Sequence, residues 1–131
     1  MERIVIEIPA VASSLLIDGK ILSQTSFVGP GTPNLHPAVW NFVNSLPDEK
    51  RRGFTGRCAE SALISDKLWE MDAAPGRGRI TTIEEAASAF SGAALVSRMI
   101  REPHHPYHGK PATPCPACYA LLEALGVEII Y

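Results

Sequence analysis

Three cysteines in this chain have the residue type and spacing to hold a metal ion. Cys115 and Cys118 are separated by two residues, and Cys58 stands alone earlier in the chain. Catalytic zinc sites take three ligands from the protein and leave the fourth position open, whereas structural sites are closed by four. We therefore predict a zinc site with Cys58, Cys115 and Cys118 as its ligands.

Glu60 follows Cys58 by two positions and is the candidate for acid–base chemistry. Residues two apart on a helix point about 200° apart, so Glu60 should not bind the same ion as Cys58. A carboxylate beside such an ion can instead move protons between water, substrate and leaving group. The helix dipole alone would explain a glutamate in a first turn, but its place beside Cys58 favours the catalytic interpretation.

All three cysteines are expected at the starts of helices. One helix is predicted from Cys58 to about Met71, and another from Cys115 to Leu125, where Gly126 ends it. Unpaired N–H groups and the positive end of the helix dipole stabilise thiolates at such positions. Two helices lying side by side would bring the three sulfur atoms to one ion.

The remaining elements predict one α/β domain. Asp18-Gly19 separates two runs of alternating apolar residues and suits the type I′ turn of a hairpin. A hairpin followed by alternating helices and strands predicts a single mixed sheet covered by helices. Further strands are expected over residues 1–8, 93–99 and 127–131. Further helices are expected over residues 37–46 and from Thr82 to Gly92, and the second begins with a capping box formed by Thr82 and Glu85.

Composition limits the class of protein. The chain has 131 residues, a formal net charge of −2 and an isoelectric point of about 6.1, which indicate one globular domain without a strongly basic surface for duplex nucleic acid. No apolar run is long enough to span a membrane, and the N-terminus lacks the pattern of a signal peptide. We therefore expect a cytoplasmic protein that binds no membrane. An odd number of cysteines favours metal binding over a disulfide framework.

Two stretches resemble the signature of the cytidine deaminase-like superfamily, H-x-E followed by P-C-x-x-C. They are Cys58-Ala59-Glu60, with cysteine in place of histidine, and the run from Pro114 to Cys118. Within that superfamily the chain looks most similar to the YwqJ-like deaminases, over residues 14–26, 54–60, 64–66 and 121–127. The resemblance implies a three-layer α/β fold, with an N-terminal hairpin in a mixed sheet and helices on both faces.

The resemblance also implies a function. A zinc-dependent hydrolytic deaminase would remove an exocyclic amine from a nucleobase and release ammonia, with Glu60 as the proton shuttle. Cytosine, in a nucleoside or in single-stranded nucleic acid, is the favoured substrate, and a purine or another amino-heterocycle is the alternative. YwqJ-like deaminases are associated with bacterial toxin systems, which leaves open an immunity protein or a second copy of the chain as partners.

Candidate substrate contacts come from the segments around the motifs. Phe54 and Tyr107 could stack on a base, His104 could line the mouth of the pocket, and Ala59 lies between the two motif residues. For the two aromatic side chains, apolar packing is an equal alternative, and the histidine loop could simply be solvated. Trp40 and Trp69 lie on apolar helix faces and are expected in the core.

Other interpretations of the cysteines remain. A structural zinc site would need a fourth ligand, for which His36, His104, His105 and His108 are available. The chain would then be a zinc-stabilised binding module without turnover. A thiol–disulfide protein using Cys115 and Cys118 would leave Cys58-Ala59-Glu60 unexplained. In a catalytic site, Arg57, Arg98 or Arg101 could offset the negative charge of three thiolates.

Overall fold

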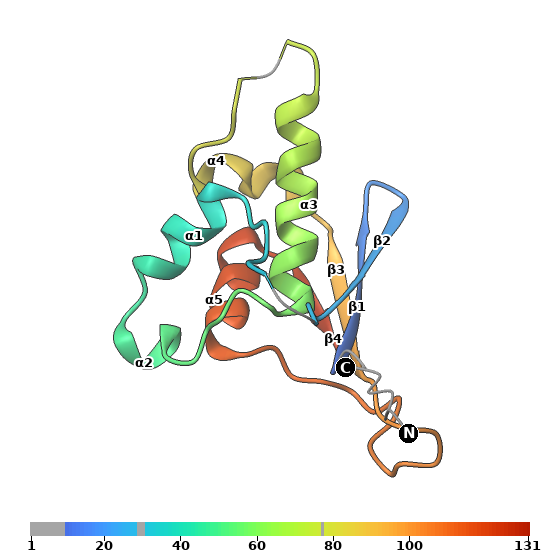
Figure 1. Cartoon of the computed structure of the whole chain (residues 1–131). Coiled ribbons are helices and arrows are strands. Elements are labelled where there is room, and N and C mark those ends of the chain that lie inside the picture. Colours follow the sequence, from blue (N-terminus) through green and yellow to red (C-terminus); the bar gives the residue numbers. More distant parts are fainter. Residues whose placement is uncertain (1–9, 29–30, 77) are drawn as a thin grey trace.

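The architecture is a four-stranded mixed sheet with helices packed against it (Figure 1). The computed structural model describes residues 10–28, 31–76 and 78–131. The sheet order is β2-β1-β3-β4, in which β1 is antiparallel to β2 and β3, and β4 is parallel to β3. The predicted α/β class, with its mixed sheet and N-terminal hairpin, is confirmed. The strands are β1 (Val11–Ile17), β2 (Lys20–Thr25), β3 (Ala94–Met99) and β4 (Glu128–Ile130).

The hairpin forms where the sequence predicts it. Ile17 pairs with Lys20, and the two residues between them, Asp18 and Gly19, have φ values of 52° and 73°. Positive φ at both central residues is the geometry of a type I′ turn, which matches the twist of the flanking strands. The strand predicted over residues 1–8 lies outside the described residues.

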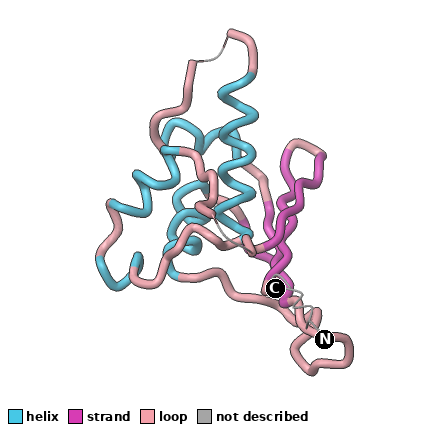
Figure 2. Tube along the Cα trace, in the orientation of Figure 1, coloured by secondary structure: helices cyan, strands magenta, loops and turns pink. Residues whose placement is uncertain are grey.

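The helices that carry the cysteines also begin as predicted. Cys58 and Cys115 are the N-cap residues of α3 and α5, and Gly126, at φ 71°, ends α5 in the left-handed conformation. None of the helices in the described part of the chain has the length and apolarity that a membrane crossing requires. The helices are α1 (Pro37–Asn44), α2 (Asp48–Arg51), α3 (Ala59–Ala73), α4 (Ile83–Ala86), the 3-10 helix η1 (Ala87–Phe90) and α5 (Pro116–Leu125) (Figure 2).

Two helical segments differ from the prediction. The charged stretch after Pro47 forms the short helix α2, in which Arg51 contacts Asp48 one turn earlier. The helix predicted from Thr82 to Gly92 is divided into α4 and η1. Its predicted start is correct, because Thr82 Oγ1 accepts a hydrogen bond from the backbone N–H of Glu85 at 3.2 Å.

The described helices pack on one face of the sheet. On β1, Leu15 and Ile17 point towards the helices and are at most 4% exposed, whereas Leu16 and its cross-strand partner Ile21 are 41% and 69% exposed. Figure 1 shows the helices gathered on one side of the hairpin. Helices on both faces were expected from the resemblance, and within the described residues no helix covers the second face.

The core between the helices and the sheet fixes the positions of α3 and α5. Leu63 and Leu68 of α3 and Leu121 and Leu122 of α5 are fully buried in one cluster with Phe90. Burial of one such side chain contributes about 1.5–3 kcal/mol relative to its exposure. This packing holds the two helices together, and their N-terminal ends carry the candidate site.

Candidate metal centre

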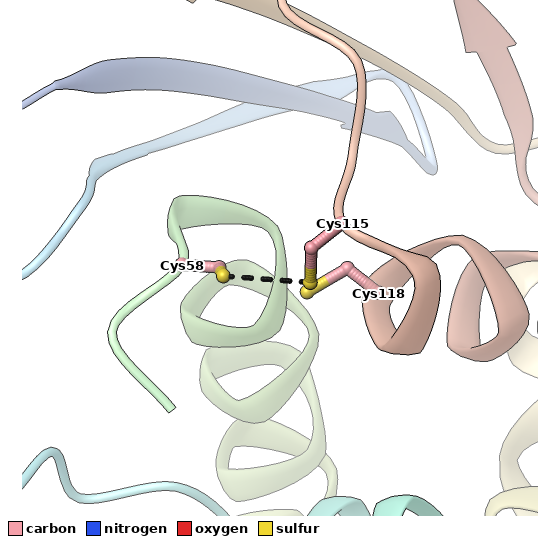
Figure 3. Close-up of side chains that lie close together, drawn as sticks. All are labelled: Cys58, Cys115 and Cys118. Atoms are coloured by element: carbon pink, nitrogen blue, oxygen red, sulfur yellow. Dashed lines mark hydrogen bonds between the residues drawn. The ribbon is translucent and has the colours of Figure 1, made fainter. Parts of the chain in front are cut away.

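The structure brings the three cysteines together at the adjoining starts of α3 and α5 (Figure 3). Their sulfur atoms all lie within 4.8 Å of one another, and the Sγ atoms of Cys58 and Cys115 are 3.7 Å apart. Within the described residues, no histidine or carboxylate joins this group. The three thiols could therefore hold a metal ion with one coordination position left for another ligand.

The three thiols share their protons unequally. The pKa of Cys115 is lowered because its sulfur accepts hydrogen bonds from the Cys118 and Cys58 thiols and from the backbone N–H groups of Ala117 and Cys118. The hydrogen bond with Cys115 raises the pKa of Cys58 and that of Cys118, and burial adds to both. The cluster thus favours one thiolate, and a bound cation would stabilise the further thiolates that a metal site needs.

The turn before Cys58 depends on Gly56. This residue has φ +78°, and a Cβ atom added to it would lie 2.7 Å from the indole of Trp40. Only glycine fits such a left-handed position against an aromatic ring. The close approach of the backbone to Trp40 therefore sets where Cys58 enters α3.

The segment before Cys115 is tied to the sheet. The backbone N–H of Ala112 donates to the carbonyl oxygen of Ser97 at 3.0 Å, and Pro111 forms an isolated bridge with Arg98. Strand β3 therefore continues its pairing with the chain that leads into the two cysteines of α5. This pairing limits how far Cys115 can move relative to the sheet.

Glu60 lies in the first turn of α3 and is buried, with 4% of the residue exposed. Its Oε2 accepts a hydrogen bond from the Ser97 hydroxyl at 3.1 Å. Burial raises the pKa of Glu60, and the neighbouring Cys115 sulfur raises it further, against lowering contacts from the Glu60 N–H and Ser97. A buried carboxyl with a raised pKa beside a thiol cluster is typical of a group that gains and loses protons in a reaction.

A groove of about 360 Å³ reaches the cluster at Cys58. Its wall includes Phe27 and Trp69, which are 40% and 36% exposed, and Arg57. The Arg57 guanidinium lies over the Phe27 ring, 4.9 Å from its centroid, and donates to the carbonyl oxygen of Gly31. The prediction that Trp69 lies in the core is wrong, because Trp69 is an exposed residue that lines this groove.

The predicted substrate contacts do not line the groove. Phe54 packs edge-on against Trp40, with ring centroids 5.8 Å apart, and Ala59 is fully buried. Tyr107 is 60% exposed and lies against His105, and His104 is an exposed loop residue with φ 70°. Phe27 lines the groove and was not predicted from the sequence. The sequence feature that could have indicated it is an aromatic residue in the loop directly after the hairpin.

The histidine alternative for a fourth ligand has no support among the described residues. His36 caps α1 through Nδ1, which accepts from the Ala38 N–H at 3.0 Å, and its Nε2 lies 2.8 Å from Asp72 Oδ2. Both ring nitrogens are therefore already bonded. Of the candidate cations, Arg57 lines the groove beside Cys58, whereas Arg101 donates to backbone carbonyl oxygens.

Comparison with known proteins agrees with the geometry. A family model described as YwqJ-like deaminase matches residues 7–127, a range that contains the three cysteines and Glu60. No curated protein and no solved structure matches the chain. Since the family match spans most of its length, the chain belongs to the YwqJ-like deaminase family.

Proposed function

We propose that this deaminase is zinc-dependent and hydrolytic, and that it removes an exocyclic amine from a nucleobase and releases ammonia. The observation that carries the proposal is the convergence of Cys58, Cys115 and Cys118 within 4.8 Å in a chain of a deaminase family. Three thiol donors, with no fourth ligand beside them in the described part of the chain, fit the donor set of catalytic zinc. When bound, zinc would supply the Lewis acidity that activates a water molecule.

Glu60 would move the protons in this reaction. Its carboxyl group is buried at the start of α3, two residues after Cys58, so it is shielded from bulk water. Its raised pKa brings it closer to neutral pH, where a carboxyl group can both accept a proton from water and return it to a nitrogen. The exchange leaves Glu60 as it began, which is what a shuttle requires.

Arg57 supports the charge balance of the site. Cys58, Cys115 and Cys118 as thiolates would leave a formal charge of −1 with Zn²⁺, which would weaken the Lewis acidity that the ion supplies. Arg57 precedes Cys58 and lies in the wall of the adjoining groove. Its positive charge would offset part of the thiolate charge and attract an anionic substrate.

The groove supports a planar aromatic substrate. Its volume of about 360 Å³ is within the range of small-molecule sites. Phe27 and Trp69 are partly exposed aromatic residues of its wall, and stacking of a base on an aromatic side chain is worth about 1–3 kcal/mol. Cytosine in a nucleoside or a single strand remains the favoured substrate, with a purine or another amino-heterocycle as the alternative.

The test is a screen for ammonia release by the zinc-loaded protein. The substrates are free bases, nucleosides, single-stranded DNA and RNA, and the matching duplexes, and the control is the same protein stripped of metal. We expect release from cytosine-containing substrates only when zinc is present. A protein that holds one zinc per chain and releases no ammonia from any substrate would contradict the proposal.

The same screen separates nucleic acid from nucleoside substrates. A base must leave the stack to reach a buried site, so single strands should react faster than duplexes. The net charge of −2 also opposes tight binding of a duplex. Equal rates on both forms, or activity confined to free nucleosides, would reject the single-strand substrate.

A further inference from the structure

A chain of two serine hydroxyls lies behind Glu60. The Ser97 hydroxyl donates to Glu60 Oε2 at 3.1 Å, and the hydroxyl oxygens of Ser13 and Ser97 are 2.6 Å apart. Ser13 and Ser97 are each 2% exposed. Because a hydroxyl has one proton and Ser97 gives its proton to the carboxylate, Ser13 must donate to Ser97.

The backbone holds this pair rigidly. Ser13 and Ser97 are directly opposite each other in the antiparallel pairing of β1 with β3. On its other edge, Ser97 accepts a hydrogen bond from Ala112, in the segment that leads to Cys115. Ser97 is thus fixed between two paired segments, and a contact from such a position can orient a carboxylate closely.

Stability alone does not explain the pair. Buried hydroxyl groups lose their hydration, and replacing both partners of a buried hydrogen bond by apolar groups of similar shape is often neutral or stabilising. The next residue of β1 offers a comparison, because Ser14 forms a similar hydroxyl contact with Ser23, at 2.8 Å, away from Glu60. The pair that reaches Glu60 is the buried one.

We propose that Ser97, supported by Ser13, is a positioning residue that anchors one oxygen of the Glu60 carboxylate and leaves the other oxygen for proton transfer at the cysteine cluster. This inference rests on the proposed function, since it assigns Ser97 a part in the work of Glu60. Loss of the anchor would let the carboxylate rotate, and a small misplacement of a catalytic group is costly to turnover.

The first test measures kcat, KM and zinc content for Ser97→Ala, Ser13→Ala, Ser97→Thr and the matched control Ser14→Ala. In Ser97→Ala, we expect kcat to fall about tenfold or more, the range for a hydrogen bond to a charged group, while KM and zinc stay near wild type. In Ser13→Ala, kcat should fall by less than in Ser97→Ala. Ser97→Thr keeps the hydroxyl group and should retain most of the wild-type kcat. Ser14→Ala should match wild type.

The second test needs no activity. Melting temperatures of the metal-free protein are measured for Ser97→Ala and Glu60→Ala, singly and combined, with Ser14→Ala in place of Ser97→Ala as the control. Residues in direct contact give non-additive shifts, and separated residues give additive ones. We expect the Ser97 shift to depend on whether Glu60 is present, and the Ser14 shift to be independent of it.

The outcomes separate this inference from the proposed function. Wild-type protein that releases no ammonia would overturn both. If the wild type is active, any one of four results would overturn the inference alone. Two concern Ser97→Ala: a kcat equal to that of Ser14→Ala, or a loss of zinc. The others are a kcat of Ser97→Thr that stays as low as that of Ser97→Ala, and additive melting shifts.

Discussion

Replacing Glu60 by glutamine should abolish turnover and leave the fold and the metal site in place. Glutamine has nearly the same size, and its carbonyl oxygen can still accept the hydrogen bond that Ser97 donates at 3.1 Å. An amide cannot take up and return a proton at neutral pH. General acid–base catalysis contributes about 10²–10⁴-fold, so kcat should fall at least about 100-fold, or about 2.7 kcal/mol in the barrier.

Although Glu60→Gln should lower turnover, it should raise the stability of the metal-free protein at neutral and higher pH. Burial raises the pKa of Glu60 above its ordinary value of 4.5, so the folded state binds this proton more tightly than the unfolded state. The charged carboxylate therefore destabilises the fold as pH rises from 4.5 through the raised value, by about 1.4 kcal/mol for each unit of difference. Glu60→Gln should melt higher than wild type at pH 8, and the gap should close as pH falls towards 4.5.

The assay compares ammonia release, zinc content and melting temperature for wild type, Glu60→Gln and Glu70→Gln. Glu70 lies on the same helix, is exposed, and pairs only loosely with Lys67 at 3.5 Å, so its variant controls for the loss of one charge from α3. Near-normal turnover by zinc-loaded Glu60→Gln would refute the shuttle. A melting difference that does not change with pH would refute the account of the buried carboxyl.

Three further changes test the site. Cys118→Ala removes a fully buried member of the proposed ligand set, so it should lower zinc content well below the expected value of about one per chain and lower the melting temperature, as elemental analysis and thermal melting would show. Gly56→Ala should lower the free energy of unfolding by about 2–4 kcal/mol in a denaturant titration, because it combines a left-handed backbone with a clash against Trp40. Trp69→Ala should raise KM about tenfold or more by removing a stacking surface, with zinc content unchanged.

Each of these changes has its own control or contrary result. Full zinc in Cys118→Ala would remove that residue from the ligand set. Gly53 has a similar φ of +82° with no atom within 4 Å of an added Cβ, so Gly53→Ala should cost only about 1–2 kcal/mol. Equal losses at the two glycines would rule out the Trp40 contact. Tyr119 is 47% exposed on α5 outside the groove wall, and Tyr119→Ala should leave KM unchanged.

Local sequence patterns predicted most of the elements. Asp18-Gly19 determines its turn from two adjacent residues, and Gly126 ends α5 by its own backbone preference. The short helix α2 was missed because four residues give no usable periodicity. The division of α4 from η1 changes the hydrogen-bond spacing without changing the N-cap at Thr82, so the start was predictable and the interruption was not.

Some residues of the site could likewise be predicted from the sequence, and others could not. The cysteines and Glu60 could be proposed because residue type and spacing carry their chemistry. The partners of Glu60 could not, since Ser97 is 37 positions away in sequence and Ser13 is 84 positions from Ser97. Trp69 was misplaced because the apolar side of a helix does not show which of its members lies at the border of a groove. The contact of Ser13 with Ser97 depends on the register of β1 with β3, and the groove beside Trp69 depends on the loop after the hairpin.

The two buried hydroxyls have a consequence for the polarity of their hydrogen bonds. A proton taken up on the other oxygen of Glu60 leaves Oε2 able to accept from Ser97, so the order from Ser13 through Ser97 to Glu60 is the same whether or not the carboxyl group carries a proton. A lysine or arginine in the same place could only donate, and it would favour the anion alone. The neutral pair therefore holds Glu60 in place in both protonation states, and it adds no charge beside the three thiols.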